Sequence, residues 1–295
     1  MRRLSLLAIA LAARVCVAHA APPPPLGVVA TIEPIAMIAR ELAGAHFTVS
    51  TLVPPGASPH TFDPRPGDVV RVARAALLIA VGGGLDGWTQ RLLGASGRPV
   101  ETLVLLELPD LAPLPAAGAA SRGSDPHVWL DPLRVRDVLA PAIAARLEHL
   151  DPAHAADTAA RLADLQARLT SLDRDLRAVL AGPRRAYVAF HAAWRYFGAR
   201  YGLEEIGVIE EAPGEEPGPR ELAELVAAAR AVGVRAILIE PQLDPRVART
   251  LAAEFGATTI LVDPNGDPTD PERAGYEGLL RWNARAFARA LGGSS

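Results

Sequence analysis

The chain has 295 residues, of which half are hydrophobic, 5% are aromatic and 21% are charged, with a formal net charge of −3. This composition is typical of a soluble globular protein with an aliphatic core and enough length for two modest domains. The small acidic excess argues against nucleic acid as a partner, because surfaces that bind nucleic acid are strongly basic.

Residues 1–20 have the pattern of a secretory signal peptide. Two arginines precede a short apolar run, and an A-x-A cleavage site ends at Ala20. We therefore predict secretion and maturation after Ala20, which leaves 27 Arg against 33 Asp and Glu, a net charge of −6. Because the only cysteine, Cys16, lies in this segment, we expect no disulfide or thiolate metal site in the mature chain.

Apolar runs and amphipathic helices alternate through the next part of the chain. The runs that we predict as strands are 26–31, 47–53, 76–82 and 100–108, and the predicted helices are 34–43, 66–75, 87–96 and 133–150. The strands are almost continuously apolar, as in parallel sheets covered by helices on both faces. Residues 107–124 lack periodicity and are predicted to form a surface loop.

One long helix is predicted in the middle of the chain. Its apolar stripe recurs at alternating steps of three and four residues, at Leu162, Leu165, Leu169, Leu172, Leu176 and Val179. A helix of about 28 residues would be roughly 40 Å long, and Gly182 with Pro183 would end it. We favour a helix packed along a globular body over a coiled-coil arm, because three heptads with weak charge pairing are short for a coiled coil.

Strands and helices alternate again after this helix. Predicted strands are 185–191, 204–211, 234–241 and 257–264, and predicted helices are 219–233, 244–256 and 276–291. The predicted fold is therefore α/β, with two parallel-sheet lobes joined by the long helix. The predicted divisions are the signal peptide, an N-terminal lobe at 21–152, a linking helix at 153–182 and a C-terminal lobe at 183–295.

Four side chains that can bind a metal follow predicted strands or occupy a stiff turn. They are His60, His127, His191 and Asp263, with two in each half of the chain. Ligands bind beyond the carboxyl ends of strands in open α/β sheets, so these groups could converge in the cleft between the lobes. Three neutral imidazoles and one carboxylate suit Zn²⁺. Taken singly, each histidine also fits an ordinary hydrogen-bonded role.

Other polar residues have simpler interpretations. We interpret the three remaining histidines outside the signal peptide as surface residues, namely His46, His149 and His154. Asp131 is predicted to cap the following helix, and Trp129 is predicted to pack in the core. The acidic residues between Glu210 and Glu216 are interpreted as a solvated loop.

Several motifs resemble one family of transport proteins along nearly the whole mature chain. They are LVPPGASPHTFDPRPGD, DPHVWLDP, YVAFHAAWRYFGARYGL, EEPGPRELAELV, ILIEPQ and LVDPNGD. They are similar to the periplasmic zinc/manganese ABC-transporter solute-binding proteins, of the ZnuA and TroA type. The resemblance implies two lobes on one rigid helix, a metal between them, and the four ligands named above.

By resemblance, members that select manganese or iron carry a carboxylate where His191 stands, so this chain is predicted to bind Zn²⁺, with Mn²⁺ as the alternative. The resemblance also implies a monomer in the periplasm that delivers the ion to a cognate ABC permease and is not an enzyme. Many zinc members have a histidine-rich loop before the D-P-H motif, which this chain lacks.

Two other functions stay open. A secreted zinc hydrolase would need an open coordination position and a general base. The candidate bases are Glu33, Glu210, Glu211 and Glu240, but the chain has no H-E-x-x-H motif. An adhesin or interaction module with a structural metal is the third hypothesis.

Overall fold

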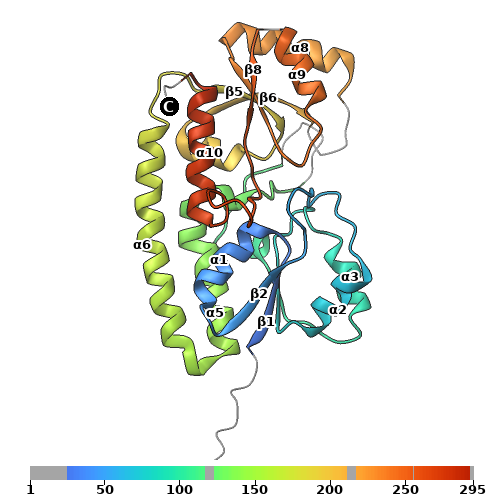
Figure 1. Cartoon of the computed structure of the whole chain (residues 1–295), viewed down its shortest axis with the longest axis vertical. Helices are drawn as coiled ribbons and strands as arrows, with labels where there is room; N and C mark the ends of the chain where they lie inside the picture. Colours follow the sequence, from blue (N-terminus) through green and yellow to red (C-terminus); the bar gives the residue numbers. More distant parts are fainter. Residues whose placement is uncertain (1–24, 117–122, 211–216, 255, 293–295) are drawn as a thin grey trace, which may run out of the picture.

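The computed structural model describes residues 25–116, 123–210, 217–254 and 256–292, which form two four-stranded sheets and a long helix beside them (Figure 1). The predicted signal peptide and residues 211–216 of the acidic segment lie outside the described residues. No helix in the described ranges is both long and apolar enough to cross a membrane.

The first sheet contains four parallel strands in the order β2-β1-β3-β4. These strands are β1 (Leu26–Ala30), β2 (Phe47–Thr51), β3 (Leu77–Ala80) and β4 (Thr102–Val104). Val28 of β1 lies opposite Val49 on one side and Leu77 on the other. The helices of this part are α1 (Glu33–Ala43), α2 (Pro66–Arg74), α3 (Thr89–Ala95), α4 (Pro132–Arg134) and α5 (Ala140–Leu150).

The second sheet repeats this topology with strands β6-β5-β7-β8, again all parallel. Its strands are β5 (Ala186–His191), β6 (Glu204–Glu210), β7 (Ala236–Ile239) and β8 (Thr258–Leu261). The helices are α7 (Arg195–Tyr201), α8 (Pro219–Val232), α9 (Arg246–Glu254) and α10 (Tyr276–Ala290). The helix α7 was not among the predicted elements.

The strand order places the ligand-capable residues. In each sheet the second strand in the sequence pairs with one edge of the first strand, and the third strand pairs with its other edge. Loops at the carboxyl ends of such strands diverge and leave a crevice between them, which is the usual binding position in open α/β sheets. In the second sheet the diverging loops are those after β5 and β7, where His191 and Glu240 lie, whereas His60 and Asp263 follow the edge strands β2 and β8.

The long helix α6 (Ala155–Val179) has 25 residues, about 38 Å at 1.5 Å per residue. Leu165, Leu169, Leu172 and Leu176 are buried as the stripe predicted. The prediction for Val179 is wrong, because the helix ends there with Val179 46% exposed and Leu180 takes the buried position.

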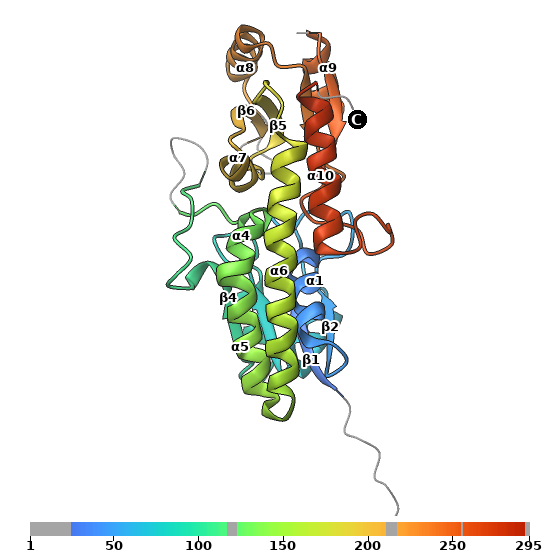
Figure 2. The same ribbon diagram turned by 90° about the vertical axis from the view of Figure 1, so that its left-hand side faces the viewer.

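The last helix, α10, lies alongside α6 (Figure 2). Arg281 of α10 forms an ion pair with Asp175 of α6 at 2.9 Å, and Arg168 of α6 reaches Glu277 of α10 at 2.7 Å. The end of the second half of the chain therefore packs directly against the long helix, in addition to following it in sequence.

Two predicted elements differ in detail. Strand β4 has three residues because the chain turns into a 3-10 helix at Leu105–Glu107. The predicted helix at 133–150 contains a wide π turn at Val135–Leu139, between α4 and α5. Pro141 follows this turn and has no N–H to offer the preceding turn, which accounts for the local widening.

Candidate metal centre

His60 lies in the loop that follows β2, and Trp88, the residue just before α3, holds this loop in place. The carbonyl of Pro59 accepts a hydrogen bond of 2.9 Å from Trp88 Nε1. Trp88 is buried and Phe62 packs against it edge-on, with ring centroids 4.8 Å apart. The backbone beside His60 is thus anchored on both sides.

His127 is buried in the turn before α4 and is oriented by Asp125. Asp125 Oδ1 accepts from the backbone N–H of His127 at 2.9 Å and lies 2.9 Å from its Nδ1. A carboxylate on Nδ1 keeps the proton there and leaves Nε2 as a free lone pair. The D-P-H sequence therefore contributes the ligand together with the residue that sets its tautomer.

His191 is the last residue of β5, and Glu240 plays the same role for it. Glu240 follows β7 directly, and its Oε2 lies 3.3 Å from His191 Nδ1. Its Oε1 accepts from Trp194 Nε1 at 3.1 Å. All three side chains are buried. Nε2 of His191 is therefore the nitrogen available to a ligand.

The three imidazoles come together. Their ligand-capable nitrogens lie within 4.8 Å of one another, and Nε2 of His60 is 3.3 Å from Nε2 of His127. A cavity of about 10 Å³ lies among them, which is the volume of one water-sized probe. Its lining is completed by Ser58, Pro59, Glu240, Gln242, Leu243, Pro264 and Asn265. A single ion fits this cavity, whereas an organic substrate does not.

The electrostatics differ among the three rings. Burial, with the nearby imidazoles of His127 and His191, lowers the pKa of His60 to about 2. Burial also lowers the pKa of His127, and the hydrogen bond and charge of Asp125 only partly oppose it. Burial lowers the pKa of His191 too, but the charge and hydrogen bond of Glu240 outweigh it, so its net direction is upward. At neutral pH His60 and His127 are thus held neutral, as metal binding requires.

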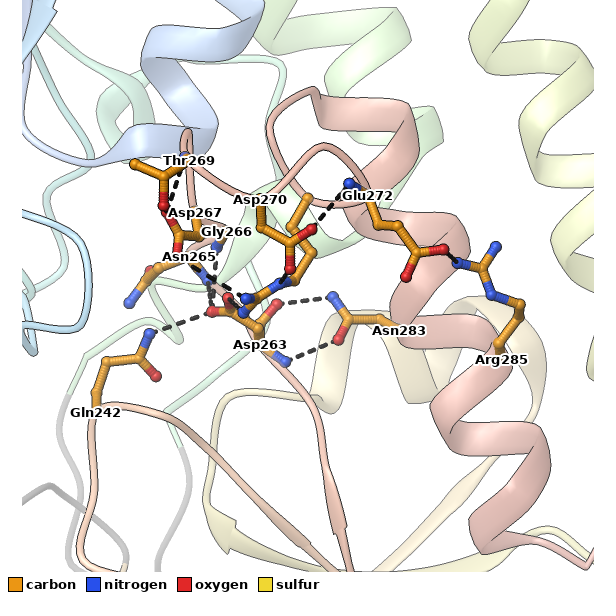
Figure 3. A network of polar contacts seen from close by, with 11 residues as sticks. Gln242, Asp263, Asn265, Gly266, Asp267, Thr269, Asp270, Glu272, Asn283 and Arg285 are labelled. Carbon is orange, nitrogen blue, oxygen red and sulfur yellow. Dashed lines mark hydrogen bonds and ion pairs between the residues drawn. The ribbon is translucent and has the colours of Figure 1, made fainter.

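Asp263, the fourth predicted ligand, is engaged elsewhere (Figure 3). Its Oδ1 accepts from Gln242 Nε2 at 3.1 Å and from the backbone N–H groups of Asn265 and Gly266. Its Oδ2 pairs with Arg273 Nη1 at 2.7 Å. Among the described residues, Asp263 belongs neither to the group of close ligand atoms nor to the cavity lining. The structure thus brings the three histidines together and leaves Asp263 beside them.

The turn that carries His127 also joins the two halves of the chain. Asp131 caps α4 as predicted, accepting from the N–H of Leu133 at 2.9 Å. It also receives a bidentate pair from Arg200 of α7, at 2.9 and 3.0 Å. Trp129 is fully buried, and its Nε1 donates to the carbonyl of Pro264 at 2.7 Å. His127 is therefore held against the second half by several bonds.

Sequence reasoning missed Asp125 as the residue that orients His127, and it named Glu240 only as a candidate base and not as the partner of His191. Asp125 stands two positions before His127, and Glu240 follows a buried strand, which is the same signal that pointed to the histidines. Arg273 lies in an irregular segment with no pattern that predicts its pairing with Asp263. The surface interpretation holds for His149, which is exposed. It is incomplete for His46 and His154, whose rings stack on each other at 3.9 Å.

Comparisons with known proteins agree with this arrangement. Residues 28–290 match a family model described as ZnuA, zinc-uptake complex component A, periplasmic. The chain is 28% identical to the manganese-binding lipoprotein MntA of Halalkalibacterium halodurans, over 90% of this chain and 88% of that protein. It is 27% identical to the high-affinity zinc uptake system protein ZnuA of Paracoccus denitrificans, over 90% and 91%.

A solved structure of a zinc-bound ZnuA deletion mutant has a TM-score of 0.81 and 28% identity, and covers 92% of this chain and 99% of that one. The periplasmic zinc-binding protein TroA of Treponema pallidum has a TM-score of 0.81 at 23% identity, which shows the fold alone. The predicted fold, two parallel-sheet α/β lobes with one long helix, is confirmed.

Proposed function

The chain belongs to the ZnuA family of zinc-uptake components, and on this premise we propose that it captures Zn²⁺ outside the cytoplasm and delivers it to an ABC-type membrane permease. The observation that carries the proposal is the convergence of the ligand nitrogens of His60, His127 and His191 within 4.8 Å. The proposed domains are those of the sequence: 21–152, 153–182 and 183–295.

The donor set favours zinc over manganese. Imidazole nitrogen suits Zn²⁺, whereas Mn²⁺ prefers carboxylate, carbonyl and water oxygen. Three imidazoles at close range leave an oxygen donor for the fourth position only, so Mn²⁺ should bind more weakly than Zn²⁺. The relatives include both a zinc-uptake and a manganese-binding protein, so Zn²⁺ and Mn²⁺ are the two ions to compare by titration.

We propose Asp263 as the fourth ligand on one condition. Its Oδ1 already accepts three hydrogen bonds, and its Oδ2 is paired with Arg273. The carboxylate can contribute to the ion only if one of its oxygens exchanges such a partner for the metal. Its contribution to affinity should therefore be smaller than that of an imidazole, which has a free lone pair.

Carriage of the ion, rather than hydrolysis, is the activity that the site supports. A hydrolase needs room for a substrate and a general base next to the bound water, whereas this cavity measures about 10 Å³. Glu240, a candidate base that lines the cavity, is buried and accepts from Trp194 while facing His191. It therefore orients a ligand in this proposal and does not act as a base.

The proposal is tested by competition calorimetry on the protein stripped of metal. Zn²⁺ and Mn²⁺ are titrated against wild type and against His60→Ala, His127→Ala and His191→Ala, with His149→Ala as the matched control on exposed helix surface. We expect each of the three changes to weaken Zn²⁺ binding strongly and the control to match wild type. If the three variants keep wild-type affinity, the proposed function is wrong.

A further inference from the structure

The turn between α5 and α6 lies at the end of α6 that is remote from the second sheet (Figure 2), and this turn contributes to a second group of metal-capable side chains. His46 lies between α1 and β2, whereas Asp151 and His154 lie in the turn between α5 and α6. The ligand-capable atoms of these three residues are all within 4.8 Å of one another. Asp157, in the first turn of α6, places Oδ2 3.2 Å from His46 Nε2. We call these four residues the α6 cluster.

The imidazoles of the α6 cluster are pre-arranged by the carboxylates. Asp151 Oδ2 lies 2.7 Å from His154 Nδ1, so Nε2 of His154 is left as the nitrogen for a ligand. The rings of His46 and His154 stack with centroids 3.9 Å apart and planes inclined by 19°. The stack brings the two rings face to face, so that both imidazoles present nitrogens to the same small space.

We propose that the α6 cluster is a second binding site for a borderline divalent ion such as Zn²⁺. Two imidazoles and two carboxylates are a donor set that suits this ion, and the two carboxylates supply the two negative charges that neutralise it. This site is separate from the three-histidine centre and does not depend on the proposed function.

The cluster can close around an ion at low cost. Bonds of about 2.1 Å in a tetrahedral site put ligand atoms roughly 3.4 Å apart, which is somewhat closer than the spread of up to 4.8 Å among the atoms of His46, Asp151 and His154. Asp157 lies outside that group and joins it through its contact with His46. The side chains are partly exposed, from 23% for Asp151 to 61% for Asp157, so they can rotate without disturbing the core. The same exposure makes this site weaker than the buried centre, because water and salt screen it.

A simpler explanation is that the α6 cluster contains two independent hydrogen bonds between histidine and aspartate and no ion. The two explanations differ in stoichiometry. Hydrogen bonds alone bind no Zn²⁺. A metal site in the α6 cluster binds a second equivalent of Zn²⁺ per chain and links the turn before β2 to the turn before α6.

The experiment counts Zn²⁺ by equilibrium dialysis on the full chain after metal removal. The variants are His46→Ala, His154→Ala, the control His149→Ala on the last turn of α5, and the double variant His60→Ala with His127→Ala. We expect two equivalents for wild type and for His149→Ala, and one for each change in the α6 cluster. The double variant should keep the equivalent that the α6 cluster binds. Thermal unfolding without metal checks that every variant is folded.

One equivalent in wild type would overturn the inference, and so would two equivalents retained in both His46→Ala and His154→Ala. The proposed function fails separately. If the double variant keeps both equivalents while the two α6-cluster variants lose one, the second site stands and the three-histidine centre does not.

Discussion

Changing Glu240 to Gln tests how the metal centre is organised without touching a ligand. Gln has the same size, but it replaces one carboxylate oxygen with an NH₂ group that donates and cannot accept. Glu240 now faces His191 Nδ1 at 3.3 Å and accepts from Trp194 Nε1 at 3.1 Å. If the Gln oxygen stays on Trp194, its NH₂ faces His191 and forces the proton of that ring onto Nε2, the nitrogen that must bind the metal.

The expected loss follows from this change of tautomer. Partners that orient a metal-binding histidine typically contribute about 10- to 100-fold in metal affinity, or about 1.4 to 2.7 kcal/mol. A flipped amide would keep the proton on His191 Nδ1, but it would set its NH₂ against the N–H of Trp194 and leave two buried donors without an acceptor. The first orientation, which satisfies both contacts and weakens the site, is therefore the favoured one.

The assay is Zn²⁺ competition against a chromophoric chelator at constant pH, with thermal unfolding of the metal-stripped protein as the check of folding. Glu224→Gln is the matched control, because Glu224 lies on α8 in an exposed ion pair with Arg220. Wild-type affinity in a folded Glu240→Gln protein would refute the role assigned to Glu240 and the orientation of His191 derived from it.

Three further predictions use the same protein. Asp263→Asn should weaken Zn²⁺ binding in calorimetry less than His127→Ala does, because the carboxylate is already committed to other partners; equal losses would contradict this order. In the same titrations, Zn²⁺ affinity should fall by about tenfold per pH unit below the raised pKa of His191. Only this ring gains a proton there, because the pKa values of His60 and His127 are lowered. A loss of affinity that corresponds to three protons per ion would contradict this. Trp129→Phe removes the N–H that donates to the buried carbonyl of Pro264. Urea denaturation should therefore show a free energy of unfolding that is lower by about 1 to 3 kcal/mol. An unchanged value would count against this bond between the two halves.

The fold was predictable because its strands are short, apolar and regularly spaced. Runs such as 76–82 and 185–191 can be buried only in a sheet covered on both faces, and the steps of three and four in the leucine stripe define α6. Val179 shows the limit of that argument, because periodicity does not locate the residue at which a helix ends.

The candidate site was predictable where its residues lie at the ends of predicted strands or in a stiff turn. His191 ends β5 and His127 follows a stiff D-P pair, so topology brings them together. The pairing of Asp263 with Arg273 could not be read from the sequence, because the two lie ten positions apart in an irregular stretch of chain. The contact between His46 and His154 was equally hidden, since it depends on how the turn before α6 meets the turn before β2.

Anomalous diffraction at the zinc edge, from crystals grown with one equivalent of Zn²⁺, tests the central claim most directly. The account predicts that the strongest peak lies among His60, His127 and His191, with nitrogen ligands at about 2.0 to 2.1 Å. A strongest peak anywhere else, with these three imidazoles unligated, would contradict it.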